Sequence, residues 1–105
     1  EIINQLNISC THVHAFNMDE YADEEGNTAP KEWKGGFQYW MWHDFFNRIK
    51  SELRMPEKQI HFPSTKNVRY YSKMIEDLAG ADVCYGGIGW SDISHFLNHI
   101  LVLIT

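Results

Sequence analysis

The spacing of apolar residues along the chain predicts helices and strands in alternation. Residues 11–16 alternate polar and apolar side chains, as a half-buried strand does, and residues 17–34 are acidic and rich in turn formers, as a loop is. A short amphipathic helix precedes them. Downstream, the pattern predicts a helix over residues 36–53, a short strand over 59–62, a helix over 65–79 that ends at Gly80, and a buried strand over 81–85.

This order of elements predicts an α/β fold. Strands that alternate with helices form parallel sheets with the helices packed on the faces, so we expect part of a three-layer α/β/α sandwich of the Rossmann-like type. Ligands of such sheets bind at the carboxyl ends of the strands. Two segments follow strands here, residues 17–20 and a glycine-rich turn over residues 86–91. The sequence therefore predicts a site where these two segments meet.

The helix expected over residues 36–53 begins with an aromatic run, residues 37–46, that is apolar almost all round. A helix of this kind must be covered on more than one side. A stacking platform for nucleic acid bases is the alternative interpretation, but such platforms carry interleaved basic residues and this run does not. We therefore favour a role in the core or in a subunit contact.

Composition and charge exclude several classes of partner. The chain of 105 residues has a formal net charge of −5 and no Lys/Arg cluster in its sequence, which argues against nucleic acid or an anionic membrane. No apolar run approaches the roughly 20 residues of a membrane span. Cys10 and Cys84 lack the spacing of metal ligands and suit a reducing compartment. We expect a soluble cytoplasmic domain.

Two carboxylates, Asp19 and Glu20, directly follow the first predicted strand. A carboxylate that is partly desolvated at a strand end can act as a general base, although a solvated acidic loop explains the same residues. The second candidate segment contains Gly86, Gly87 and Gly89, which would let a ligand approach the backbone. It lacks the full spacing of a dinucleotide or P-loop motif, so it is a weak signal by itself.

Histidines offer a further, weaker candidate. His12 and His14 are two residues apart on a predicted strand, and with Asp19 they would form a conceivable metal site. Hydrogen bonds to the core or a neighbouring loop are the commoner role of such histidines, and we expect no metal. His95 and His99 have helical spacing, but no Glu lies between them.

Residues 13–21, which read VHAFNMDEY, resemble the T-F-N-M-D-E-Y signature of the glucosamine-6-phosphate deaminase/isomerase family. Further similarity follows in order along the chain, in the aromatic helix, in residues 55–62, in residues 70–76, and in the G-G-x-G string at residues 86–89. The resemblance extends over about residues 1–91. It implies an enzyme that isomerises glucosamine-6-phosphate to fructose-6-phosphate with loss of ammonia, without a metal or an organic cofactor.

The resemblance also implies roles for individual residues. Asp19 matches the family's base, which shuttles a proton between the first two sugar carbons, and Glu20 would order the site. Gly86, Gly87, Gly89 and Ser91 would line the pocket for the phosphorylated amino sugar. The family's Asp falls on Ser91 here, so a relative that acts on another phosphosugar stays an open alternative.

The tail departs from the family, which continues G-x-D-G-H-I-A-F-x-E-P after the glycine turn. Within synonymous codon choice, one added guanine re-reads residues 92–103 as GHISFFEPHLGF, which restores that motif. We therefore expect residues 1–91 to be the central part of the enzyme domain and residues 92–105 to be a frame-shifted tail. The chain is interpreted as an inactive fragment. The alternative is a non-catalytic domain that binds a sugar phosphate or self-associates through an exposed sheet edge or the aromatic helix.

Overall fold

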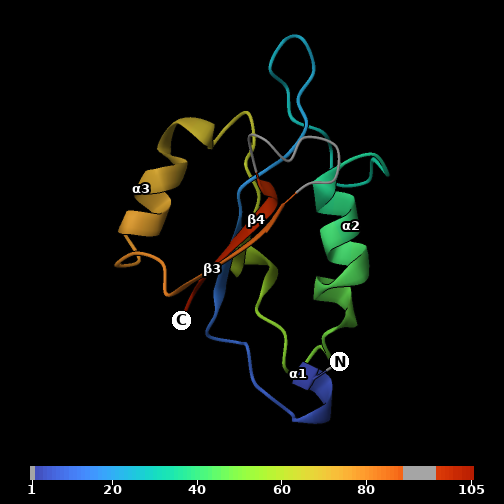
Figure 1. The fold of residues 1–105 in the computed structure, drawn as a ribbon, viewed down its shortest axis with the longest axis vertical. Coiled ribbons are helices and arrows are strands. Elements are labelled where there is room, and N and C mark those ends of the chain that lie inside the picture. The colour runs from blue at the N-terminus through green and yellow to red at the C-terminus, as the bar shows by residue number, and fades with distance from the viewer. Residues whose placement is uncertain (1, 89–96) are drawn as a thin grey trace.

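The computed structural model describes residues 2–88 and 97–105, which form one four-stranded sheet with short helices around it (Figure 1). The strands follow the spatial order β2-β1-β4-β3. The strands are β1 (His14–Asn17), β2 (Ile60–His61), β3 (Val83–Ile88) and β4 (Leu97–Ile104). The α-helices are α1 (Ile2–Gln5), α2 (Phe37–Asp44) and α3 (Tyr71–Glu76), and the 3₁₀ turns are η1 (Phe46–Arg48), η2 (Glu57–Gln59) and η3 (Val68–Tyr70).

The sheet is mixed, so the prediction of an all-parallel sheet is wrong. Strands β1 and β2 are parallel, whereas β4 is antiparallel to both β1 and β3. The three strands expected from the sequence therefore share one direction, but β4 separates two of them. An apolar strand in this place pairs the open edge of β1 and buries Val102 and Ile104, which are 7% and 3% exposed. The sheet with its helices is compatible with part of an α/β fold, and the full three-layer sandwich stays a prediction.

Strand β4 comes from the segment that the sequence analysis interprets as a frame-shifted tail. Its residues pair with β1 from His14↔Ile104 to Asn17↔Leu101, and with β3 from Val83↔Leu103 to Ile88↔Leu97. The division of the chain into an enzyme domain over residues 1–91 and a frame-shifted tail over residues 92–105 stays a prediction, which only the gene sequence can test.

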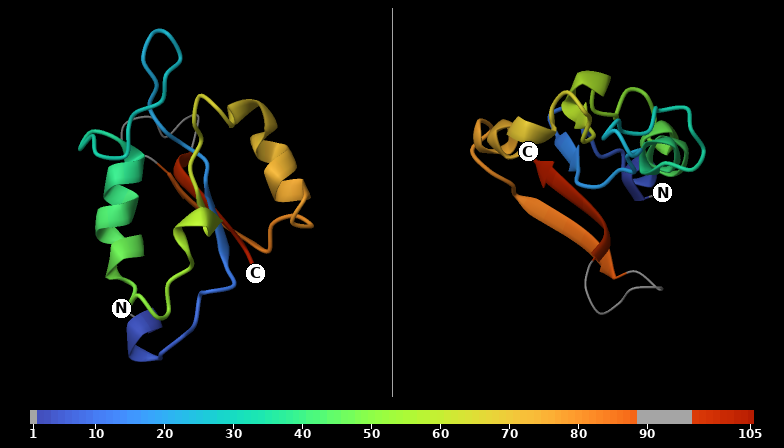
Figure 2. Two further views of the ribbon diagram at one scale, coloured as in Figure 1. Left: turned by 180° about the vertical axis from the view of Figure 1, so that it is seen from behind. Right: turned by 90° about the horizontal axis from the view of Figure 1, so that it is seen from above.

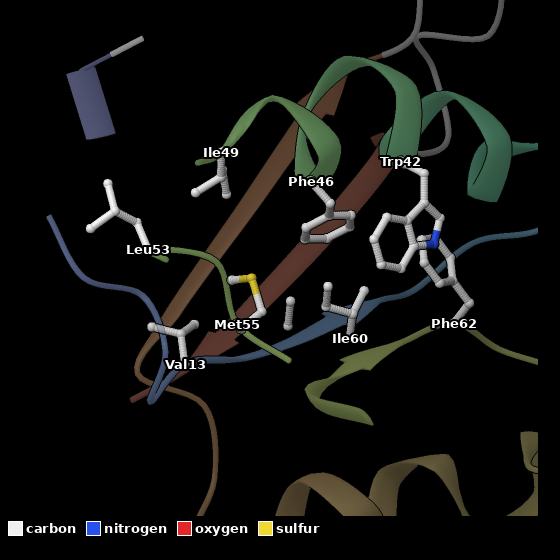
Figure 3. Packing of buried hydrophobic residues seen from close by; sticks show 9 residues of the cluster. Val13, Trp42, Phe46, Ile49, Leu53, Met55, Ile60 and Phe62 are labelled. Atoms are coloured by element: carbon white, nitrogen blue, oxygen red, sulfur yellow. The ribbon is translucent and has the colours of Figure 1, made fainter. Parts of the chain in front are cut away.

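Helices α2 and α3 lie on either side of strand β1 (Figures 1 and 2). The side chains of Ala15 and Phe16, both 0% exposed, point to opposite faces because successive side chains alternate along a strand. Ala15 belongs to the cluster on the α2 side, where Trp42 and Phe46 point toward Ile60 of β2 (Figure 3). This cluster also contains Val13, Ile49, Leu53, Met55 and Phe62. Phe16 packs on the α3 side with Tyr71, Val102 and Ile104.

The aromatic helix is shorter than predicted. Helix α2 ends at Asp44, and Phe45 leaves the helical region with φ −127° before η1 begins. The break lets the chain turn, so that Phe46 and Ile49 both enter the core, 0% and 4% exposed. Trp40 on the outer side is 46% exposed, so the expectation that the helix is covered on more than one side is wrong for that residue.

The strand expected over residues 81–85 is present as β3, but it is not buried. Val83 is 40% and Tyr85 58% exposed, because within residues 2–88 and 97–105 β3 is the last strand of the sheet and pairs with β4 alone. The β3–β4 pair projects away from the helices (Figure 2, right). Among the described residues, no helix is long and apolar enough to cross a membrane.

Candidate functional site

Asn17, the last residue of β1, is fully buried and joins three elements. Its side-chain Nδ2 donates a hydrogen bond of 2.9 Å to the His61 carbonyl of β2. Its own carbonyl accepts a bond of 2.6 Å from the Tyr71 hydroxyl of α3. Burial raises the pKa of Tyr71, so the hydroxyl keeps its proton and remains a donor. The backbone that leads into residues 18–20 is therefore held from both sides.

Asp19 lies two residues beyond this anchor and is half-buried. Its Oδ2 atom is buried and has no hydrogen-bond partner among the residues that the structure describes. Most buried polar atoms in folded proteins have a partner, so an oxygen without one is a position at which a ligand hydroxyl can bind. Asp19, which the sequence predicts to be the base, thus has a carboxylate oxygen that accepts no hydrogen bond within the described residues.

Glu20 holds the next element in place. Its carboxylate accepts hydrogen bonds of 2.9 Å from the backbone N–H groups of Phe37 and Gln38, the first two residues of α2, and of Tyr21. A carboxylate at a helix N-terminus satisfies N–H groups that have no partner within the helix and interacts favourably with the helix dipole. A Cβ on Gly36 would lie 3.1 Å from this carboxylate, so Gly36 permits the close approach. These contacts of Glu20 are with backbone N–H groups, and both its role in ordering the site and its binding of substrate stay predictions.

The glycines of the second candidate segment are placed differently from the sequence prediction. Gly86 and Gly87 belong to β3, paired with Ile100 and His99 of β4, so the turn predicted over these two residues is wrong. The apolar partner strand β4 extends the ladder through them. Gly89 and Ser91 lie outside the described residues, and their predicted roles stay predictions.

The register shows how the two candidate segments are related in space. Asn17 of β1 and Tyr85 of β3 both pair with Leu101 of β4, so they lie at one level across the sheet. Asp19 therefore lies beyond the end of β1, on the side toward which β3 continues through Gly86, and a site formed by both segments stays a prediction. Neighbouring strands lie about 4.8 Å apart, so β4 places β1 and β3 about 10 Å from each other.

The histidines do not form a metal site within the described residues, where no group of three potential ligands occurs. His12 is exposed, and the ring of His14 stacks 6.0 Å from that of His61. Burial lowers the pKa of His61, and the nearby His14 lowers it further. His95 is outside the described residues, and His99 is in β4.

Sequence reasoning did not identify the supporting residues Asn17, His61 and Tyr71 as a group. The sequence feature that could have indicated their role is the polar residue Asn17 at the end of a strand with apolar residues. The loop that follows Asp19 and Glu20 in the sequence borders a cavity of about 310 Å³, which is lined by Tyr21, Asp23, Asn27 and Trp33.

The chain is similar in sequence to several proteins named glucosamine-6-phosphate deaminase. It is 32% identical to the protein of Dictyostelium discoideum over 93 residues, which is 85% of this chain and 32% of that protein. It is 31% identical to the protein of Shouchella clausii, over 77% of this chain and 32% of that protein. For Drosophila pseudoobscura pseudoobscura the identity is 26%, over 85% of this chain and 31% of that protein. The chain thus spans about a third of the length of these relatives. No family model and no solved structure matches it.

Proposed function

Because this chain is a divergent member of the glucosamine-6-phosphate deaminase family, we propose that it is the part of an amino-sugar phosphate isomerase/deaminase that carries the catalytic base, Asp19. The reaction would convert glucosamine-6-phosphate and water to fructose-6-phosphate and ammonia. Asp19 would accept a proton from one of the first two sugar carbons and return it to the other. A phosphorylated amino sugar is the substrate class that the names of the relatives support.

The observation that carries the proposal is the way Asp19 is held. Its Oδ2 is buried without a partner among the described residues, while the flanking residues Asn17 and Glu20 are each fixed by hydrogen bonds to other elements. A base must be positioned before the substrate arrives, because misplacement of about 1 Å can cost a hundredfold in rate. Two anchored neighbours restrict the backbone of Asp19 in this way.

We propose that the chain alone does not turn over the substrate. Isomerisation with loss of ammonia needs a base, an acid and an anchor for the phosphate held together, and the chain spans about a third of the length of its relatives. Gly86, Gly87, Gly89 and Ser91 would line the pocket in the complete enzyme, with Glu20 ordering it.

The test begins with the gene. Sequencing through and beyond the codon for Ser91 shows whether one added base opens a long frame that reads GHISFFEPHLG onward. If it does, the restored protein is assayed for ammonia release from glucosamine-6-phosphate, with the 105-residue chain and a restored Asp19→Asn variant beside it. We expect release from the restored protein alone. Full activity of the Asp19→Asn variant, or turnover by the short chain, would overturn the proposal.

A second assay, which follows the sugar phosphate product instead of ammonia, identifies the substrate. Fructose-6-phosphate formation from glucosamine-6-phosphate supports the deaminase assignment, whereas turnover of a phosphosugar without an amino group supports the relative with another substrate. The replacement of the family's Asp by Ser91 makes this second comparison necessary.

A second candidate function, self-association, follows from the exposed edge of the sheet. Among the residues that the structure describes, strand β3 has a partner on one side alone, and it exposes Val83 and Tyr85. This arrangement favours edge-to-edge pairing. Size-exclusion chromatography with light scattering over a range of concentrations tests it. A Tyr85→Lys variant should shift the chain toward the monomer, and a wild-type chain that is monomeric throughout would contradict this candidate.

A further inference from the structure

Two adjoining cavities border the C-terminal half of α2 and the segment after it. The first has a volume of about 480 Å³ and is bordered by Lys31, Trp42, Asn47, Ser51, Arg54 and Glu57. The second, of about 430 Å³, shares Lys31, Trp42 and Asn47 with it. None of these residues belongs to the candidate site around Asp19.

The larger cavity is positively charged although the chain as a whole carries −5. Lys31 and Arg54 contribute two positive charges and Glu57 one negative charge, which leaves the cavity one positive charge in excess. The folded chain brings Lys31 from the long loop beside Arg54 from the segment after η1. The sequence shows no basic cluster because these two residues are far apart along the chain.

Both cations are held in position. Arg54 donates from Nε and Nη2 to the Ile49 carbonyl at 3.3 and 3.2 Å, which fixes the plane of its guanidinium group and leaves most of its N–H donors available. The Lys31 ammonium lies 4.2 Å from the centre of the Trp42 ring and 3.2 Å from Glu57 Oε2. The guanidinium group of Arg54 is therefore oriented before a ligand binds, and the Trp42 ring lies against the Lys31 ammonium at the border of the cavity.

Neutral donors complete the lining. Asn47 and Ser51 border the same cavity and supply amide and hydroxyl groups. Trp42 is 8% exposed, and its indole Nε1 is buried without a hydrogen-bond partner among the described residues. Paired cations with hydroxyl and amide donors are a set that suits an oxyanion, because each oxygen accepts several hydrogen bonds.

We propose that this cavity binds a small oxyanion, the phosphate or carboxylate group of a ligand, through Lys31 and Arg54 with Asn47 and Ser51 as neutral donors. Glu57 competes with that oxyanion for Lys31, so binding requires the Lys31–Glu57 ion pair to open. The inference does not depend on the proposed function, since no residue of the Asp19 segment takes part.

The test is a titration of the full chain with sodium phosphate, followed by ¹H–¹⁵N NMR at constant ionic strength and neutral pH. We expect saturable shifts of the Asn47, Ser51 and Arg54 amide signals. Sodium acetate in a parallel titration separates a carboxylate from a phosphate as the preferred group, and sodium chloride is the control for ionic strength. Equal shifts with chloride, or shifts that do not saturate with either oxyanion, would overturn the proposal.

Variants sharpen the test. Arg54→Gln removes a charged donor and should weaken binding by about tenfold or more. Glu57→Gln removes the competing carboxylate and should tighten binding severalfold, a gain that misfolding cannot produce. Lys31→Gln removes the second cation and should also weaken binding. Lys66→Gln makes the same charge change outside the cavity, so as the control it should leave binding unchanged. Unaltered affinity in both Arg54→Gln and Glu57→Gln would also refute the site.

Discussion

Strands β1 and β3 run in the same direction and end at the same side of the sheet, but the fold supports them very differently. Strand β1 is covered on both faces, with Ala15 and Phe16 completely buried between α2 and α3. Strand β3 pairs on one side in the described part of the chain and leaves Tyr85 more than half exposed. The difference teaches that the two segments predicted to form the site have unequal support: Asp19 follows a strand built into the core, whereas Gly86 and Gly87 lie on an edge strand.

The largest expected effect on the free energy of unfolding comes from truncating one aromatic side chain in each region. Phe46→Ala in the core beneath β1 should lower the free energy of unfolding by about 3–5 kcal/mol, because it removes a fully buried ring and leaves a cavity. Tyr85→Ala on β3 should cost much less, since its ring is already largely in water. Urea unfolding followed by circular dichroism measures both. Similar losses from the two variants would show that β3 is as deeply packed as β1.

Next in size is the loss of the Glu20 contacts. Glu20→Ala removes the acceptor for two N–H groups of α2 and should lower the free energy of unfolding by about 1–2 kcal/mol. Glu24→Ala, in the exposed loop nearby, makes the same change of side chain without these contacts and serves as the control. An equal effect of the two variants in urea unfolding would mean that the α2 cap does not stabilise the chain.

Tyr71→Phe should have a smaller effect, about 1 kcal/mol, because it removes one hydrogen bond and keeps the ring in place. The adjacent Tyr70→Phe, on an exposed side chain, is the matched control and should change the unfolding midpoint little. If the two variants unfold at the same urea concentration, the Tyr71 hydroxyl does not anchor the end of β1.

The smallest expected effect is a dependence of stability on pH. Burial and His14 lower the pKa of His61 below its ordinary value of 6.5. The unfolded chain therefore binds more protons than the folded chain as the pH falls below that value, and stability should be full above it and decline below it. The urea concentration at the midpoint of unfolding, measured above and below that pH, tests whether stability declines as the pH falls.

Two variants assign this pH dependence. His61→Gln should flatten the decline, whereas His12→Gln, at an exposed position, should leave it unchanged. A decline of the same size in the His61→Gln variant would assign it to other groups.

Much of the local structure could be predicted. The alternating pattern before Asn17 predicts β1, and the common direction of β1, β2 and β3 agrees with the α/β interpretation. The helix expected over residues 65–79 is shorter, because η3 and α3 together extend from Val68 to Glu76, and Gly80 with φ +88° lies beyond the end of α3. The limits of the helices could not be predicted as well. The pattern of residues 36–53 continues past Asp44, but the chain leaves the helix at Phe45, and Phe46 and Ile49 beyond it are buried in the core.

The candidate site was predictable in part for a similar reason. The position of Asp19 after a strand is a local property, and the similarity to the deaminases concerns the same segment. The anchors of that segment are separated from it by many residues: His61 and Tyr71 reach Asn17 across 44 and 54 positions. Hydrogen bonds between residues so far apart in the sequence depend on how the elements pack, and a local sequence pattern does not predict them.

The sequence by itself determined the succession of elements as far as β3, the similarity to glucosamine-6-phosphate deaminases and the position of Asp19 just beyond a strand. Tertiary structure alone decided that β4 lies between β1 and β3, that Glu20 caps α2 and that Lys31 and Arg54 border one cavity. The physical reason is that periodicity and propensity act over a few neighbouring residues. Strand order, helix caps and charge clusters instead arise when distant segments together bury their apolar faces and pair their backbone groups.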